Sequence, residues 1–215
     1  MGRFQLTDLQ KAQVAATGQP PVLTPEQLED SFADAFVLEA FSYGLQYYGA
    51  ARFGFAAMFL PVPATLLHHA LEMFLQGCLA VQDTPAQIHK YAKVYRSHKL
   101  PVLWAALKPR YPNAGLAPFD GTIDVLERFR EVRFPDNIAE FGVNLNVTFT
   151  DLPPQPAVGA PPVAPGRVFT LDMRPVDRLV VKLFQVAEIN PGFFDSLLRH
   201  PEGGRYFALR NEVPL

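Results

Sequence analysis

The stretch that most constrains the fold of this chain is residues 63–80, PATLLHHALEMFLQGCLA. Its large apolar side chains recur every three or four positions, which places them on one face of an α-helix. That face comprises Leu67, Leu71, Phe74, Leu75 and Cys78 and is widened by Leu66, Ala70 and Met73. A face this wide exceeds what a surface helix needs, so the sequence predicts a central helix that is covered on more than one side.

Two adjacent histidines and a glutamate lie within this predicted helix. At helical spacing, His68 and His69 are both neighbours of Glu72. Buried polar groups need hydrogen-bond partners, so we predict a structural network in which Glu72 accepts from His98 or Arg133 on other helices. If Glu72 is replaced by alanine, a buried cation loses its partner. We therefore predict that Glu72→Ala lowers the free energy of unfolding by about 3 kcal/mol or more. A ligand-binding or catalytic site is the alternative interpretation of the cluster His69, Glu72, His98 and Arg133.

A metal site is not expected at these histidines. Adjacent residues point about 100° apart around a helix, which prevents His68 and His69 from binding one zinc ion together. No further Cys/His motif completes such a site, and the sequence contains no glycine-rich phosphate loop and no G-x-S-x-G motif. We therefore expect neither a metal nor a cofactor.

Composition narrows the class of protein. With 215 residues, 49% of them hydrophobic, the chain can bury the core of one domain. A formal charge of −2 gives no signal for DNA binding, and the longest apolar run falls short of the roughly 18 residues of a membrane-spanning helix. The single cysteine cannot form an intramolecular disulfide, and the first fifteen positions do not follow the pattern of a signal peptide. We expect a cytoplasmic protein that does not bind membranes.

Helix start signals organise the rest of the chain. The sequences TPEQ at 24–27 and TPAQ at 84–87 each combine a capping threonine, a proline in the first turn and a glutamine at the third helical position. They predict a helix from 24 to about 53, antiparallel to the central helix, and a short helix from 84 to about 93. The predicted core face of the first consists of Phe32, Phe36, Ala40, Tyr43 and Tyr47. Further helices are predicted over 7–16, from Ser97 to Pro109, from Thr122 to Pro135, from Pro175 to Asn190, and from there to Leu198.

A different pattern follows the helices. Apolar and polar residues alternate over 143–149 and again over 168–173, which predicts two half-buried strands paired as a β-hairpin. A proline-rich loop at 153–165 joins them. We thus predict a mainly α protein with an arm at 1–23, one helical domain at 24–200 carrying the inserted hairpin at 143–173, and a tail at 201–215.

Three segments carry a family resemblance. They are HALEMFL at 69–75, SHKLPVLW at 97–104 and LERFREVRFPD at 126–136. In this order and spacing they resemble the higher eukaryotes and prokaryotes nucleotide-binding (HEPN) family. The resemblance implies an up-and-down bundle of four to five major helices, with the hairpin inserted before the last of them, and a nucleotide- or RNA-related ligand.

Many HEPN members are ribonucleases in which four to six residues separate the catalytic arginine from the histidine that follows it. The histidines here are His68, His69, His89, His98 and His200, and none follows an arginine at that interval. The resemblance therefore implies a non-catalytic binding or assembly module. A ribonuclease with a rearranged site of Arg96, His98 and Arg133 is the alternative.

Self-association is the last expectation. The family resemblance implies dimers that form through helix faces. Independently, the sequence contains more large apolar residues than one small bundle would bury. Four of them lie close together: Phe53, Phe55, Met58 and Phe59. We predict a homodimer that covers this apolar patch. The alternative is that the hairpin and the C-terminal tail cover it within one chain.

Overall fold

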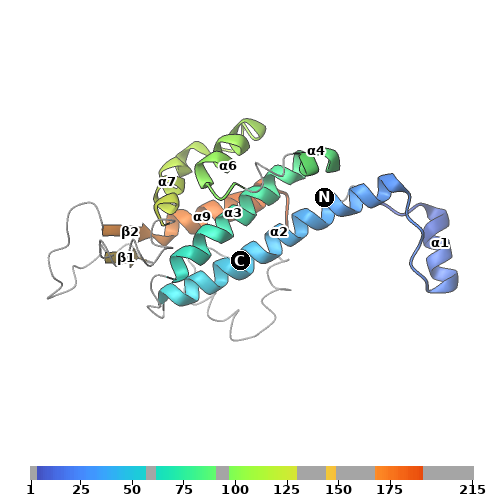
Figure 1. Ribbon diagram of the computed structural model, residues 1–215, viewed down its shortest axis with the longest axis horizontal. Coiled ribbons are helices and arrows are strands. Elements are labelled where there is room, and N and C mark those ends of the chain that lie inside the picture. The colour runs from blue at the N-terminus through green and yellow to red at the C-terminus, as the bar shows by residue number, and fades with distance from the viewer. Residues whose placement is uncertain (1–3, 57–61, 91–96, 130–143, 149–167, 191–215) are drawn as a thin grey trace.

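The computed structural model describes residues 4–56, 62–90, 97–129, 144–148 and 168–190 (Figure 1). Within these ranges the fold is mainly helical, as predicted. The helices are α1 (Asp8–Thr17), α2 (Pro25–Ala56), α3 (Val62–Gln82), α4 (Pro85–Lys90), α6 (Leu100–Leu107), α7 (Asp120–Arg128) and α9 (Met173–Val186). Two 3-10 turns, Lys108–Arg110 and Ala117–Phe119, connect α6 to α7. The strands are β1 (Asn144–Thr148) and β2 (Val168–Asp172).

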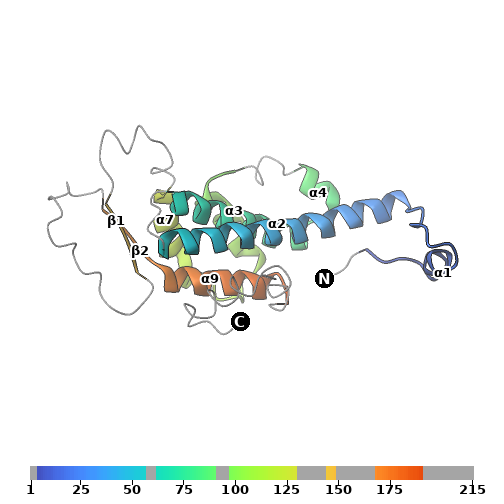
Figure 2. The same ribbon diagram turned by 90° about the horizontal axis from the view of Figure 1, so that it is seen from below.

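The long helices α2 and α3 pack side by side in opposite directions, as the short connection between them predicts (Figures 1 and 2). Their close approach depends on glycine. A Cβ atom at Gly44 of α2 would lie 2.7 Å from Cε1 of Phe74, and one at Gly77 of α3 would lie 2.6 Å from Cε2 of Phe41. Each glycine thus makes room for a phenylalanine ring of the other helix.

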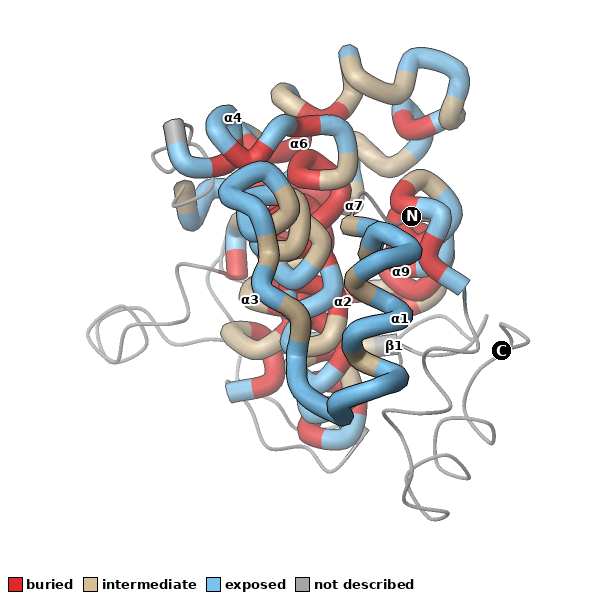
Figure 3. Tube along the Cα trace, turned by 90° about the vertical axis from the view of Figure 1, so that its right-hand side faces the viewer, coloured by how far each residue is buried: buried red, intermediate tan, exposed pale blue. Residues whose placement is uncertain are grey.

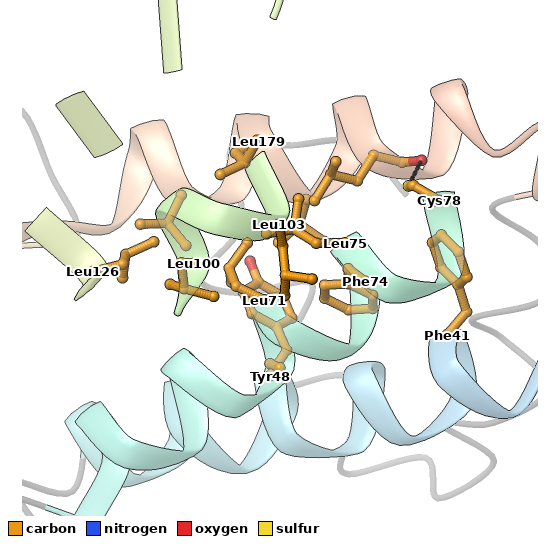
Figure 4. Close-up of a cluster of buried hydrophobic side chains, with 14 of the residues drawn as sticks. Phe41, Tyr48, Leu71, Phe74, Leu75, Cys78, Leu100, Leu103, Leu126 and Leu179 are labelled. Carbon is orange, nitrogen blue, oxygen red and sulfur yellow. Dashed lines mark hydrogen bonds between the residues drawn. The ribbon is translucent and has the colours of Figure 1, made fainter. Parts of the chain in front are cut away.

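The central position of α3 is confirmed. All five residues of its predicted main face are buried, and its buried residues extend over most of its length (Figure 3). Helices α6, α7 and α9 cover the sides that α2 leaves open (Figure 2). In the resulting core, Leu71 and Leu75 of α3 lie among leucines of these three helices (Figure 4). The leucines are Leu100, Leu103, Leu126 and Leu179.

The predicted capping boxes form. At the start of α2, the backbone N–H of Thr24 donates to Oε1 of Gln27 over 3.1 Å, and the N–H of Gln27 donates to the Thr24 hydroxyl over 3.2 Å. Thr84 and Gln87 make the same pair of bonds before α4. Thr7 and Gln10 also make it before α1, where the sequence predicted a helix but no capping box. These polar start signals are local, which explains why the sequence locates them correctly.

The predicted start of α6 at Ser97 is wrong. The helix begins at Leu100, and the Ser97 hydroxyl only accepts a 3.3 Å bond from the N–H of Lys99. A helix capped by Ser97 would need residue 101 to donate its N–H to the Ser97 carbonyl. Residue 101 is proline and has no N–H, so the helix starts later and holds Pro101 in its first turn.

The predicted core face of α2 is also wrong in part. Phe32 and Tyr43 are exposed, whereas Val37, Phe41 and Tyr48 are buried. The buried face is thus formed mainly by residues one position later in the sequence, turned by about 100°. Apolar residues occur around most of α2, so their spacing alone does not identify the face that packs on α3.

The predicted hairpin is wrong in orientation. β1 and β2 do pair, but they run parallel, with Asn144 opposite Val168 and Thr148 opposite Asp172. Alternating patterns predict strands without specifying their direction. Parallel pairing needs a connection of a dozen or more residues, and the segment 149–167 is long enough to provide one. That connection, which includes the predicted loop at 153–165, lies outside the described residues, as do the predicted helix to Leu198 and the tail at 201–215.

Candidate functional site

The candidate site is centred on Glu72, in the middle of α3. Its side chain is only 3% exposed, so its carboxylate depends on hydrogen bonds for stabilisation. Nδ1 of His98 lies 2.9 Å from Oε1, and Nδ1 of His69 lies 3.2 Å from Oε2. The side-chain amide of Gln76, one turn further along α3, also donates to Oε1 over 3.2 Å. The structure therefore brings together His69, Glu72 and His98 of the predicted cluster.

The two histidines differ from Glu72 in exposure. The side chain of His98, just before α6, is 62% exposed, and that of His69 is 39% exposed. The ring of Tyr47 on α2 meets the His69 ring edge to face, with 4.7 Å between centroids. A buried carboxylate thus orients two imidazole rings that both reach the surface where α2, α3 and the start of α6 meet.

Each histidine faces Glu72 through Nδ1. A ring that donates from Nδ1 to a carboxylate keeps Nε2 as the atom available to a ligand. Because both rings are held by a single carboxylate, both are restricted in orientation before a ligand arrives. In the imidazolium form both Nε2 atoms carry a proton and can donate to an anionic group. In the neutral form Nε2 is an acceptor, and a ring oriented in this way by a carboxylate suits general acid–base chemistry.

His68 belongs to a separate contact. Its Nε2 lies 3.4 Å from Oε2 of Glu127 on α7, and the same Glu127 oxygen accepts a 2.9 Å bond from the N–H of Leu100. Glu127 therefore satisfies one of the free N–H groups at the start of α6. The two adjacent histidines diverge to different carboxylates, as helical geometry predicts, and the described residues contain no group that could hold a metal ion. Sequence reasoning did not find this role of Glu127.

Arg96 and Arg133 lie outside the described residues, and so does His200. The rearranged nuclease site of Arg96, His98 and Arg133 is therefore represented in the described structure by His98 alone. For the predicted dimer patch, Phe55 is buried and cannot contribute, whereas Phe53 is exposed. Met58 and Phe59 lie outside the described residues.

A second buried polar cluster joins α2 to α9, and the sequence did not reveal it. The guanidinium of Arg52 and the hydroxyl of Tyr48 both donate to Oδ1 of Asp177, and Arg52 also lies 3.2 Å from the Tyr48 hydroxyl. Burial raises the pKa of Asp177 above its ordinary value, against the opposing effect of Arg52. The one available signal was an arginine among the apolar residues of α2, since a buried cation requires a partner.

Cys78 is part of the packing. It is fully buried, and its thiol lies 3.3 Å from the carbonyl oxygen of Leu183 on α9 (Figure 4). Burial raises the pKa of the thiol far above its ordinary value of 9.0, so the reactive thiolate is suppressed. Cys78 is therefore not a nucleophile in the folded protein, in agreement with its position in the predicted core face.

No described helix combines the length and the apolar character that crossing a membrane requires. No family model matches the chain, and neither a curated protein nor a solved structure is significantly similar to it.

Proposed function

We propose that this chain is a non-catalytic, HEPN-like helical module that binds a nucleotide- or RNA-related ligand through His69 and His98. The observation that carries the proposal is the attachment of both Nδ1 atoms to the buried Glu72. The nucleotide-related nature of the ligand comes from the family resemblance. The site supplies a compatible chemistry, because an imidazolium ring that donates Nδ1–H to Glu72 also has an Nε2–H group that can donate to a phosphate oxygen.

A binding role fits this geometry better than catalysis does. The family nuclease pairs an arginine with a histidine at a fixed interval, and this sequence has no such pair. Both histidines here depend on the same carboxylate, so a change at one ring alters the surroundings of the other. This coupling suits the rigid presentation of two donors to one group. Acid–base catalysis instead uses one proton donor and one acceptor that differ in protonation.

The alternative is a ribonuclease in which His98 acts with Arg96 and Arg133. One feature favours it: a carboxylate on Nδ1 with Nε2 left available is the arrangement that orients a histidine general base. The two functions differ in one measurable outcome, which is whether bound RNA is cut.

Binding is tested by fluorescence anisotropy of the purified protein with a labelled single-stranded RNA and with a labelled nucleoside triphosphate. We expect His98→Ala and His69→Ala each to weaken binding about tenfold, the effect of losing one charge-assisted hydrogen bond. His89→Ala is the matched control, since His89 on α4 is also exposed but stacks on Phe32 away from Glu72. Equal affinity in all three variants, or no binding at all, would contradict the proposal.

Cleavage is measured on the same RNA by gel electrophoresis. We expect intact RNA after prolonged incubation with the wild-type protein. Cleavage that is lost in His98→Ala, Arg96→Ala and Arg133→Ala would establish the ribonuclease and replace the binding module. Cleavage that survives all three substitutions would point to a contaminating nuclease, and repurified protein would then be required to leave the RNA intact.

A further inference from the structure

Glu127 on α7 contacts both of the segments that carry the ligand histidines. Its Oε2 accepts a 2.9 Å bond from the backbone N–H of Leu100 and lies 3.4 Å from Nε2 of His68. Leu100 follows His98 by two positions. His68 directly precedes His69 on α3. Glu127 therefore ties the start of α6 to α3 at a point that is next to both histidines.

The two histidines reach Glu72 in different ways. His69 lies three positions before Glu72 on the same helix, so the backbone of α3 alone brings the two side chains together. His98 precedes α6 and approaches Glu72 from another part of the chain. Because the His98 side chain is mostly exposed, its bond to Glu72 contributes little to holding the surrounding backbone in place. The position of His98 therefore needs a further restraint, whereas that of His69 does not.

The backbone bonds around His98 show how such a restraint reaches it. The N–H of Lys99 donates to the Ser97 hydroxyl over 3.3 Å, and the N–H of Val102 donates to the Lys99 carbonyl over 3.1 Å. His98 thus lies within a short turn that leads directly into the first turn of α6. Leu100 is the first residue of that helix, where an N–H group has no acceptor within the helix itself. When Glu127 accepts from this N–H, it fixes the point at which the turn joins α6.

We propose that Glu127 is a positioning residue for the ligand site, an inference that rests on the proposed function. By holding the first turn of α6 against α3, Glu127 sets where Nε2 of His98 lies relative to Nε2 of His69. A ligand that contacts both atoms binds more tightly when their separation is fixed before it arrives, because ordering a mobile side chain costs binding free energy. The competing explanation is that the fully buried Leu100 side chain places the turn without help from Glu127.

Three substitutions of Glu127 separate its reach from its charge. Glu127→Gln keeps the length of the side chain and an oxygen that accepts from Leu100, so it should bind the labelled single-stranded RNA almost as tightly as the wild type. Glu127→Asp keeps the charge but is one methylene shorter, and Glu127→Ala has no acceptor. Both should weaken binding, Glu127→Ala about tenfold, as His98→Ala does. Asp124→Ala is the matched control, since Asp124 is an exposed acid one turn earlier on α7. Wild-type affinity in Glu127→Asp combined with a loss in Glu127→Gln would overturn the proposal.

Double substitutions distinguish positioning from a general loss of stability. If Glu127 acts through His98, Glu127→Ala should cause no further loss of affinity in a His98→Ala protein. In a His69→Ala protein it should cause about a further tenfold loss. Equal further losses in both proteins would mean that Glu127 supports the whole fold, and wild-type affinity of Glu127→Ala alone would mean that burial of Leu100 suffices. Either result would overturn the positioning role and leave the proposed function in place.

A measurement without ligand separates this inference from the proposed function. Long-range ¹H–¹⁵N NMR spectra show which ring nitrogen of each histidine carries the proton. At mildly alkaline pH we expect both His69 and His98 to carry it on Nδ1, facing Glu72. In Glu127→Ala, His98 should change to the mixed tautomers of an imidazole in water, while His69 should not change.

The outcomes of the two kinds of measurement are independent. If the wild-type protein bound neither labelled probe but His98 changed in this way, the proposed function would fail and Glu127 would still be the residue that positions His98. Unchanged His98 signals would overturn the positioning role whether or not RNA binds. Glu127→Asp provides the same spectroscopic test if circular dichroism shows that Glu127→Ala does not fold.

Discussion

Arg52 on α2 forms a buried ion pair with Asp177 on α9, across 125 residues of sequence. The Tyr48 hydroxyl donates to the same carboxylate, so one acidic group satisfies two donors from the opposite helix. These two bonds link α2 to α9, and the two helices also meet through apolar side chains such as Phe41 and Phe184.

Replacing Asp177 with alanine should be strongly destabilising, because Arg52 would keep its charge in a buried position without the carboxylate. We expect a loss of about 3 kcal/mol of unfolding free energy. Urea denaturation followed by circular dichroism measures it. Asp8→Ala, which breaks the exposed ion pair with Lys11, is the control and should leave the midpoint unchanged. Equal effects of the two substitutions would mean that Asp177 is not required to balance Arg52.

Glu72→Ala should cost less than the sequence-based value of about 3 kcal/mol or more. That value assumed a cation stranded in the core, but His69 and His98 are open enough to solvent to hydrate their rings. The buried Gln76 amide still loses one acceptor, so we expect about 2 kcal/mol. Glu72→Gln, which keeps the shape and one acceptor oxygen, is the matched comparison and should cost less. An unchanged melting temperature for Glu72→Ala would rule out the network as a source of stability.

Gly44→Ala should destabilise the α2–α3 packing, although alanine is the better helix former. Its Cβ would lie 2.7 Å from the Phe74 ring, so the ring or the helix must move, at a cost of about 1–3 kcal/mol. Gly121→Ala is the control, because a Cβ at Gly121 of α7 meets nothing within 4 Å. At this position the higher helix propensity of alanine should dominate and raise the free energy of unfolding by about 0.5–1 kcal/mol. Thermal unfolding should show a lower melting temperature for Gly44→Ala and a higher one for Gly121→Ala. If both substitutions stabilised the protein, the Phe74 ring would have to move aside at little cost.

Stability should fall as the pH rises above about 9–10. Burial raises the pKa of Cys78 above its ordinary value of 9.0 and the pKa values of Tyr48 and Tyr111 above 10.0. In that range the unfolded chain releases protons that the folded chain retains, so the free energy of unfolding decreases. Tyr48→Phe should make the decline with pH shallower, whereas Tyr43→Phe, which removes an exposed hydroxyl, should not. Parallel pH profiles for both variants would contradict this assignment.

Cys78 should react with a thiol reagent such as Ellman's reagent only when the protein unfolds. The folded thiol is fully buried and its pKa is raised, so both access and thiolate formation are suppressed. The rate of reaction, measured against urea concentration, should follow the unfolding transition. Rapid reaction without denaturant would show that α9 opens readily from α3.

The sequence located what depends on neighbouring residues. The capping boxes before α2 and α4 each join two residues three positions apart, and the apolar face of α3 is a repeat within one helix. The bond between His98 and Glu72 was also anticipated, because a glutamate buried in an apolar helix restricts its possible partners to a few polar side chains.

Relationships between distant elements were harder to predict. The direction of β2 relative to β1 depends on how the chain travels between them, and an alternating pattern carries no such information. The buried face of α2 depends on which side α3, α4 and α9 occupy. The partner of Arg52 lies 125 residues away, and no local feature of Asp177 distinguishes it from a surface aspartate.

The contacts of α9 also affect the order in which the chain folds. Helices α2 and α3 are joined by a short connection, so their pairing closes a small loop at a low entropic cost. The bonds that join α9 to them, from Cys78 to Leu183 and from Arg52 to Asp177, each close a loop of more than a hundred residues. We expect the α2–α3 pair to form early and α9 to dock late, after most of the chain has collapsed. Native-state hydrogen exchange should then give a lower free energy of opening for the backbone amides of α9 than for those of α3. The ion pair between Arg52 and Asp177 should break in the same opening step.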